Sequence, residues 1–170
     1  MKNQFALFAA YNAWANKQLY AAASSLSAEE FGRDVGVFFH SMKGTLNHLL
    51  GADRIWMHRF TRDGLSPTRL DEILFEDFGE LAVARKAEDR RIVRYIDGLE
   101  PEDLLQTIVY TPITIPTEIR QRLGPALSHF FNHQTHHRGQ AHSVLSILGK
   151  KPPSLDLLLF QRSEEGSQYA

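Results

Sequence analysis

Residues 125–149 read PALSHFFNHQTHHRGQAHSVLSILG, and this stretch decides the fold. Pro125 stands where a proline is tolerated in the first turn of a helix, and Gly149 stands where helices commonly end. Between them only Gly139 disfavours a helical backbone. The stretch therefore predicts one long helix, and such a helix in a chain of 170 residues favours a helical bundle.

Three other stretches carry the same periodic signal. Apolar residues spaced by three and four predict helices over about 3–24, 39–62 and 76–97. Asp63-Gly64 ends the second of these helices and begins a loop over 63–75. We therefore predict an all-α fold, an antiparallel four-helix bundle, forming a single domain over residues 1–170.

Shorter elements are expected between and after these helices. Ser27-Ala28-Glu29-Glu30 has the pattern of a capping box and predicts a short helical turn. The β-branched runs 107–111 and 113–115, broken by Pro112 and Pro116, predict a small β-hairpin that decorates the bundle. A final short helix is expected from Ser154 to Phe160.

Composition and charge remove several functional classes. The 19 basic and 20 acidic residues give a net charge of −1, which argues against a protein that coats nucleic acid. The chain has no cysteine, so disulfides, thiolate zinc sites, iron–sulfur clusters and cysteine nucleophiles are all excluded. Polar residues interrupt the apolar N-terminal stretch, and no segment is long enough to span a membrane. We expect a cytoplasmic protein that binds neither membrane nor nucleic acid.

The eight histidines are concentrated in the longest predicted helix, which carries five of them between His129 and His142. At about 100° per residue, four of these imidazoles and one amide fall on a single arc, and His142 falls on the opposite side. The residues on this arc are His129, His133, His136, His137 and Gln140. Burying imidazoles without partners costs free energy, and a metal ion removes that cost by accepting their lone pairs. The alternative is a surface helix that happens to be rich in histidine.

His133 and His137 are one helical turn apart and can reach the same cation. Two ligands make a weak site, so a third is expected from the second predicted helix, which offers His40, His48 and His58. Apolar residues flank His48, which points it inward, whereas His40 and His58 face elsewhere. Three imidazoles describe an open site for one divalent ion, and zinc, nickel, iron or manganese would each accept them.

Other metal and hydrolase motifs are absent. No Glu-x-x-His occurs, which argues against a carboxylate-bridged di-metal bundle. The chain also lacks the HExxH zinc motif, an EF-hand loop, a Walker A loop and the nucleophile elbow G-x-S-x-G.

The segment Phe131–Gln140 resembles the C-terminal signature of the DinB-like proteins, in particular its core of His-x3-His followed by Arg-Gly-Gln. Three further groups resemble the same family and follow in its order: Tyr11-Asn12 with Trp14 and Asn16; Thr45-Leu46-Asn47-His48-Leu49 with Asp53 and Trp56; and Leu155 to Phe160.

This resemblance implies an up-down-down-up four-helix bundle, usually a homodimer, that binds one divalent metal through three histidines. Matched motif by motif, those ligands are His48, His133 and His137. Family members are described as metal-dependent enzymes, and related branches include low-molecular-weight-thiol transferases and a thiol-dependent isomerase.

Three functions remain open on the sequence. The first is a metal-dependent enzyme of the hydrolase or low-molecular-weight-thiol S-transferase type, acting on a small molecule, with His136 as the general base. The second is a non-catalytic, metal-binding stress-response protein, and the third is a helical interaction module. Among the supporting residues, we expect Gln140 to hydrogen-bond near the metal, Arg138 to form a structural ion pair, and Asp53 to pack in the bundle.

Overall fold

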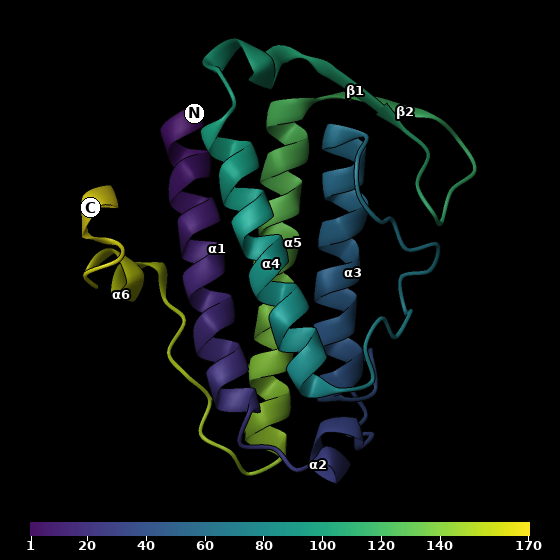
Figure 1. The fold of residues 1–170 in the computed structure, drawn as a ribbon, viewed down its shortest axis with the longest axis vertical. Helices are drawn as coiled ribbons and strands as arrows, with labels where there is room; N and C mark the ends of the chain where they lie inside the picture. The colour runs from purple at the N-terminus through teal and green to yellow at the C-terminus, as the bar shows by residue number, and fades with distance from the viewer.

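The computed structural model describes residues 1–170 and is built from helices and one two-stranded sheet (Figure 1). Four long helices make up the body: α1 (Lys2–Ala23), α3 (Met42–Thr61), α4 (Phe78–Asp97) and α5 (Leu123–Ile147). The short helices are α2 (Ala28–Gly32), η1 (Pro101–Leu105), α6 (Leu157–Gln161) and η2 (Ser167–Tyr169). The predicted all-α four-helix bundle is confirmed.

The four long helices have up-down-down-up topology. In Figure 1, α1 and α5 run downward while α3 and α4 run upward. Helix α1 packs against α4 and α5, and α3 packs against the same two helices. Because α3 and α4 are parallel neighbours in sequence, the connection over residues 62–77 must travel the length of the bundle. None of the helices is both long and apolar enough to cross a membrane.

Side-chain caps explain where the helices begin. The Ser41 hydroxyl accepts a hydrogen bond from the Gly44 amide at 3.0 Å and starts α3. Helix α3 begins three residues later than predicted because the chain turns at His40, whose φ is 65°. The capping box predicted at Ser27 is confirmed: its side chain and that of Glu30 each accept the other residue's backbone N–H.

The predicted hairpin is present, but the prediction of its second strand was wrong. Strand β1 (Thr107–Tyr110) pairs antiparallel with β2 (Ile119–Arg122), so residues 113–115 lie in the connecting loop. Pro112 and Pro116 lack the N–H that ladder pairing requires, which moves the partner strand beyond them. Strand β2 reads Ile-Arg-Gln-Arg and carries little of the β-branched enrichment that marks a strand.

Two apolar clusters fill the two ends of the bundle, and a buried polar layer separates them. One cluster holds Phe5, Trp56, Ile92 and Phe130 among others. The opposite one is built around residues such as Leu19, Leu46, Leu81 and Val144. Between them, on all four helices, lies what we name the polar layer: Asn12, Asn16, Asp53, Arg85, Asp89, Gln134 and Arg138, all buried.

Ion pairs and hydrogen bonds hold the polar layer together. Arg85 donates to Asp53 at 2.6 Å, and its other terminal nitrogen lies 2.9 Å from Asp89. Asn16 donates to Asp89 at 2.9 Å. Arg138 donates to the side-chain amide oxygen of Asn12, so the predicted ion pair of Arg138 was wrong. Two guanidinium groups and two carboxylates therefore share the middle of the bundle, and Arg85 pairs with both carboxylates.

Candidate metal centre

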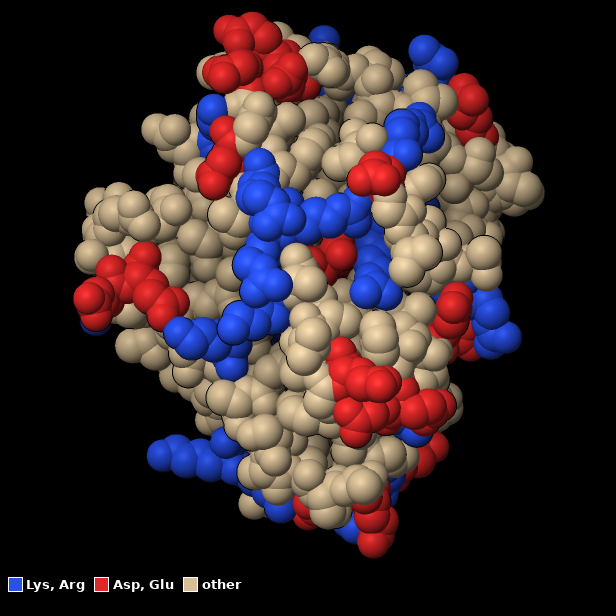
Figure 2. All heavy atoms as spheres, viewed as in Figure 1, with Lys and Arg blue, Asp and Glu red and all other residues tan.

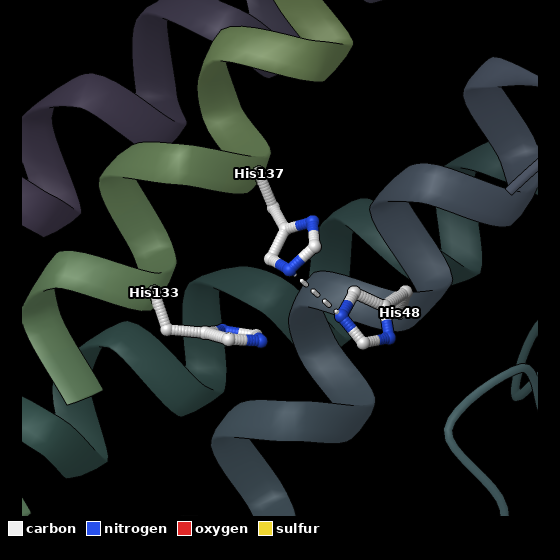
Figure 3. Close-up of side chains that lie close together, drawn as sticks. All are labelled: His48, His133 and His137. Atoms are coloured by element: carbon white, nitrogen blue, oxygen red, sulfur yellow. Dashed lines mark hydrogen bonds between the residues drawn. The ribbon is translucent and has the colours of Figure 1, made fainter. Parts of the chain in front are cut away.

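The facing sides of α3 and α5 bring three histidines together. His48 comes from the middle of α3, and His133 and His137 stand one turn apart on α5 (Figure 3). One ring nitrogen from each lies within 4.8 Å of the other two. The ring centroids of His133 and His137 are 4.2 Å apart, and those of His48 and His137 are 4.4 Å apart. The one-turn spacing of His133 and His137 on α5 and the packing of α3 against α5 thus bring the three histidines into one cluster.

The environment of His48 fixes which of its nitrogens carries a proton. The Nδ1 atom lies 2.7 Å from the backbone carbonyl oxygen of Leu70, which belongs to the long connection between α3 and α4. Because a carbonyl oxygen only accepts hydrogen bonds, Nδ1 is the protonated nitrogen and Nε2 keeps its lone pair. Phe39 stacks on the imidazole with ring centroids 3.8 Å apart, and only 4% of His48 is exposed.

His137 is held in the same tautomer by a side chain. Its Nδ1 atom lies 2.7 Å from Oε1 of Gln140, one turn later on α5. The amide oxygen accepts, so Nε2 of His137 is also unprotonated. The two Nε2 atoms, from His48 and His137, face each other at 3.3 Å. Two lone pairs cannot hydrogen-bond to each other, so this contact calls for a cation between them.

A shared proton does not supply that cation at neutral pH. Burial lowers the pKa of His48 to about 4, although the hydrogen bond to the Leu70 carbonyl opposes the shift. Burial, followed by the charges of His137 and His48, lowers the pKa of His133 to about 3. Burial also lowers the pKa of His137, although the hydrogen bond that its Nδ1 donates to Gln140 opposes the shift. All three imidazoles are therefore neutral, which is the form that ligates a metal.

The remaining histidines lie at the edge of the cluster or outside it. His136 is exposed, and its ring centroid lies 4.8 Å from that of His137. His129 is exposed one turn before His133, with its ring centroid 5.1 Å from that of Trp56. His40 and His58 do not join: Nδ1 of His40 lies 3.2 Å from Asp34, and Nδ1 of His58 lies 3.1 Å from the Gly64 carbonyl oxygen.

Sequence reasoning missed three contributors near the histidines. Phe39 covers one face of His48, and Leu70 acts only through its backbone, so neither leaves a residue-type signal. Arg59 stacks its guanidinium over Trp56 and Tyr110 at 4.5 and 4.4 Å from the ring centroids. Tyr110 comes from β1, so the hairpin adds a wall beside α3. Asp53, in contrast, binds Arg85 in the polar layer. This agrees with the prediction that Asp53 packs inside the bundle.

Comparisons with known proteins agree with this architecture. The model of the DinB family matches residues 1–168. Protein DinB of Bacillus subtilis (strain 168) is 26% identical over 163 residues, which cover 91% of this chain and 93% of that protein. The crystal structure of a DinB-like protein from Bacillus cereus ATCC 10987 has a TM-score of 0.63 at 15% identity, covering 82% of this chain and 89% of the other. The structural match supports the fold alone.

Proposed function

This chain belongs to the DinB family, and we propose that it is a metal-dependent enzyme that holds one divalent ion through His48, His133 and His137. The observation that carries the proposal is the 3.3 Å approach of two unprotonated Nε2 atoms, from His48 and His137. Three neutral imidazoles without a carboxylate or thiolate would accept zinc, nickel, iron or manganese.

The residues around the three histidines would prepare them as ligands. The Leu70 carbonyl accepts a hydrogen bond from Nδ1 of His48, and the Gln140 amide oxygen accepts one from Nδ1 of His137. Each of these hydrogen bonds orients its ring and raises the basicity of the Nε2 atom. Three protein ligands leave coordination positions for a small molecule. When bound, a divalent ion supplies a Lewis acid that lowers the pKa of a water or thiol group reaching it.

Proton transfer is assigned to His136 in this proposal. Its Nε2 lies 3.4 Å from Nε2 of Gln140, which is the nitrogen that donates. Its Nε2 therefore holds the lone pair that would take up a proton, and the Nδ1 proton of the exposed ring would then pass to solvent. His136 thus stands next to His137 on the solvent side of the cluster, where a general base is needed.

The substrate is a small molecule, and two reaction types follow from the chemistry: hydrolysis and transfer of a low-molecular-weight thiol. The test uses untagged protein loaded separately with zinc, nickel, iron or manganese. Each form is assayed with ester and amide substrates and with a thiol plus an electrophilic acceptor. We expect turnover by the wild type, its loss in His137→Ala, and its retention in His142→Ala, which removes a histidine outside the cluster.

Turnover and metal content, measured in the same variants, distinguish a metal-dependent enzyme from a non-catalytic metal-binding protein. Equal turnover by the wild type and His137→Ala would contradict the catalytic proposal. Stoichiometric metal with no turnover of any substrate would favour the non-catalytic, metal-binding stress-response function instead. His136→Gln is expected to lower the rate with metal content unchanged, because His136 moves a proton and binds no ion in this proposal.

The assembly and location of the protein remain predictions. The family resemblance implies a homodimer, which light scattering of the purified chain tests directly. A cytoplasmic location and the lack of nucleic-acid binding rest on composition and charge balance alone.

A further inference from the structure

A cavity lies on the opposite pair of helices from the histidines. It has a volume of about 730 Å³ and is lined only by residues of α1, α4 and the C-terminal segment 157–170. We name it the α1–α4 cavity. Its size falls within the range of about 300–1,000 Å³ that is usual for small-molecule sites. None of the three clustered histidines lines it, so what binds there is independent of the proposed metal centre.

The walls of the α1–α4 cavity are largely apolar. The alanines Ala10 and Ala13 on α1 leave room where larger side chains would fill the space. Trp14 and Phe160 line the cavity together, with ring centroids 5.7 Å apart, and Val93 adds to it from α4. A flat aromatic or aliphatic body would bury its surface against these groups.

Charge around the cavity is unbalanced. Five basic and two acidic side chains line it. Both acids are already engaged: Asp89 lies 2.9 Å from Arg85, and Glu165 lies 2.7 Å from Lys17. The three remaining cations form no ion pair, and each is exposed on α4: Lys86, Arg90 and Arg94.

The spacing of these three cations is unfavourable for the helix on its own. They stand at i, i+4 and i+8, so they form one stripe along α4, and like charges at this spacing repel. Figure 2 shows Lys and Arg atoms gathered in a band across the centre of this face. An anion placed along the stripe would turn that repulsion into attraction.

The buried side of the cavity holds polar atoms without partners. The Tyr20 hydroxyl and Arg85 Nε make no hydrogen bond, although both residues line the cavity and both are more than nine-tenths buried. Unpartnered buried donors are rare in folded proteins, and a water or a polar group that enters the cavity would supply their partner.

We propose that the α1–α4 cavity binds a small organic anion whose apolar body lies against Trp14 and Phe160 and whose charged group meets Arg90 between Lys86 and Arg94. The shared chemistry is a carboxylate or phosphate on a flat apolar body. A guanidinium matches either group with two parallel hydrogen bonds.

Two other occupants fit the cavity less well. A two-fold partner would place the same cationic stripe on both sides of the contact, which is repulsive in an isologous interface. Three unpaired cations in a hollow give too few phosphate contacts for useful nucleic-acid affinity. A small anion needs only one or two of these cations and also uses the apolar walls.

The test uses 8-anilinonaphthalene-1-sulfonate, an aromatic sulfonate that fluoresces in apolar surroundings. Fluorescence titration of the folded wild type is expected to show saturable binding of one probe per chain. Arg90→Glu is expected to weaken that binding about tenfold, the size of effect that loss of one charged contact produces. Lys151→Glu makes the same charge change on an exposed residue away from the cavity and is expected to change affinity less than twofold.

A second pair of variants tests the apolar walls. Ala13→Phe fills the cavity and is expected to reduce binding, whereas Ala87→Phe, on an exposed face of α4, is expected to leave it intact. Circular dichroism confirms that each variant is folded. Benzoate and phenyl phosphate as competitors then distinguish the two charged groups. N-phenyl-1-naphthylamine, which has the same body without the sulfonate, is expected to bind weakly and with no response to Arg90→Glu.

Several results would overturn the proposal. One is probe binding that Arg90→Glu and Ala13→Phe leave unchanged, and another is a dimer or a nucleic-acid complex that Arg90→Glu disrupts while probe binding is absent. Binding that a chelator abolishes would place the probe at the histidines instead. The proposal therefore stands or falls separately from the metal centre.

Discussion

The polar layer and the histidine cluster both bury polar side chains inside an apolar bundle, yet they solve the problem differently. In the polar layer, the Arg85 guanidinium lies between the carboxylates of Asp53 and Asp89, so donors meet acceptors. In the cluster, the unprotonated Nε2 atoms of His48 and His137 meet at 3.3 Å, so acceptor meets acceptor. The first region pairs its opposite charges within the chain, although Arg85 Nε and the Gln134 amide have no partner there. The second region offers two facing lone pairs and no donor between them.

The comparison shows how to separate a structural buried network from a binding site. A histidine-rich helix or a buried charge is ambiguous by itself, since buried ion pairs also shift pKa values. What distinguishes the cluster is that the outer nitrogens of two imidazoles are already occupied by acceptors, Leu70 and Gln140. Their inner nitrogens then have nothing in the chain to bind.

The largest expected effect comes from breaking the ion pairs of the polar layer. Arg85→Met leaves two buried carboxylates without their shared guanidinium and is expected to lower the free energy of unfolding by about 3–5 kcal/mol. Urea denaturation of the metal-free protein, followed by circular dichroism, measures it. Arg94→Met, an exposed change on the same helix, is expected to stay within about 0.5 kcal/mol. Similar stability in both variants would show that the layer does not depend on pairing.

The second effect is a pH dependence of the metal-free protein. The pKa of His48 is about 4 in the folded chain against an ordinary value of 6.5, so below pH 6.5 the unfolded chain binds protons that the folded chain does not. Stability is therefore lost as pH falls from 6.5 towards 4, by about 3 kcal/mol from His48 alone.

Two matched variants test whether the histidine cluster causes this loss of stability at acid pH. His48→Gln removes the titrating group, so its unfolding free energy should fall less steeply between pH 6.5 and 4. His142→Gln removes a histidine outside the cluster and should keep the slope of the wild type. A slope that both variants share would mean that the acid sensitivity originates elsewhere.

A smaller effect is expected from the residue that orients a ligand without binding the ion. Gln140→Leu removes the acceptor of the His137 Nδ1 proton and should weaken zinc affinity by about 10–100-fold, with one ion still bound per chain. Competition with a fluorescent zinc indicator measures the affinity. Unchanged affinity would mean that the tautomer of His137 is set in some other way.

The sequence predicted the helices and the histidine cluster because both depend on local periodicity. His133 and His137 are brought together by one helical turn, and His48 is placed by the apolar residues around it. The partners that matter elsewhere are distant in the chain: Arg138 meets Asn12 across 126 positions, and Arg85 meets Asp53 across 32. No local pattern encodes such pairs. The sequence alone therefore predicts an ion pair for Arg138 and does not reveal its partner Asn12.

Backbone groups and strands with weak sequence signals also could not be predicted from the sequence. The Leu70 carbonyl that fixes the tautomer of His48 could be any residue's carbonyl, so its position depends on the path of the long connection. Strand β2 was missed because pairing with β1 selects residues 119–122 despite their poor strand propensity.

The most direct test of the central claim is calorimetric titration of zinc into untagged, chelator-treated protein. We predict one ion per chain for the wild type and for His142→Ala, with that binding lost in His48→Ala and His137→Ala. Equal zinc binding by all four proteins, or none by the wild type, would contradict a metal centre formed by these imidazoles.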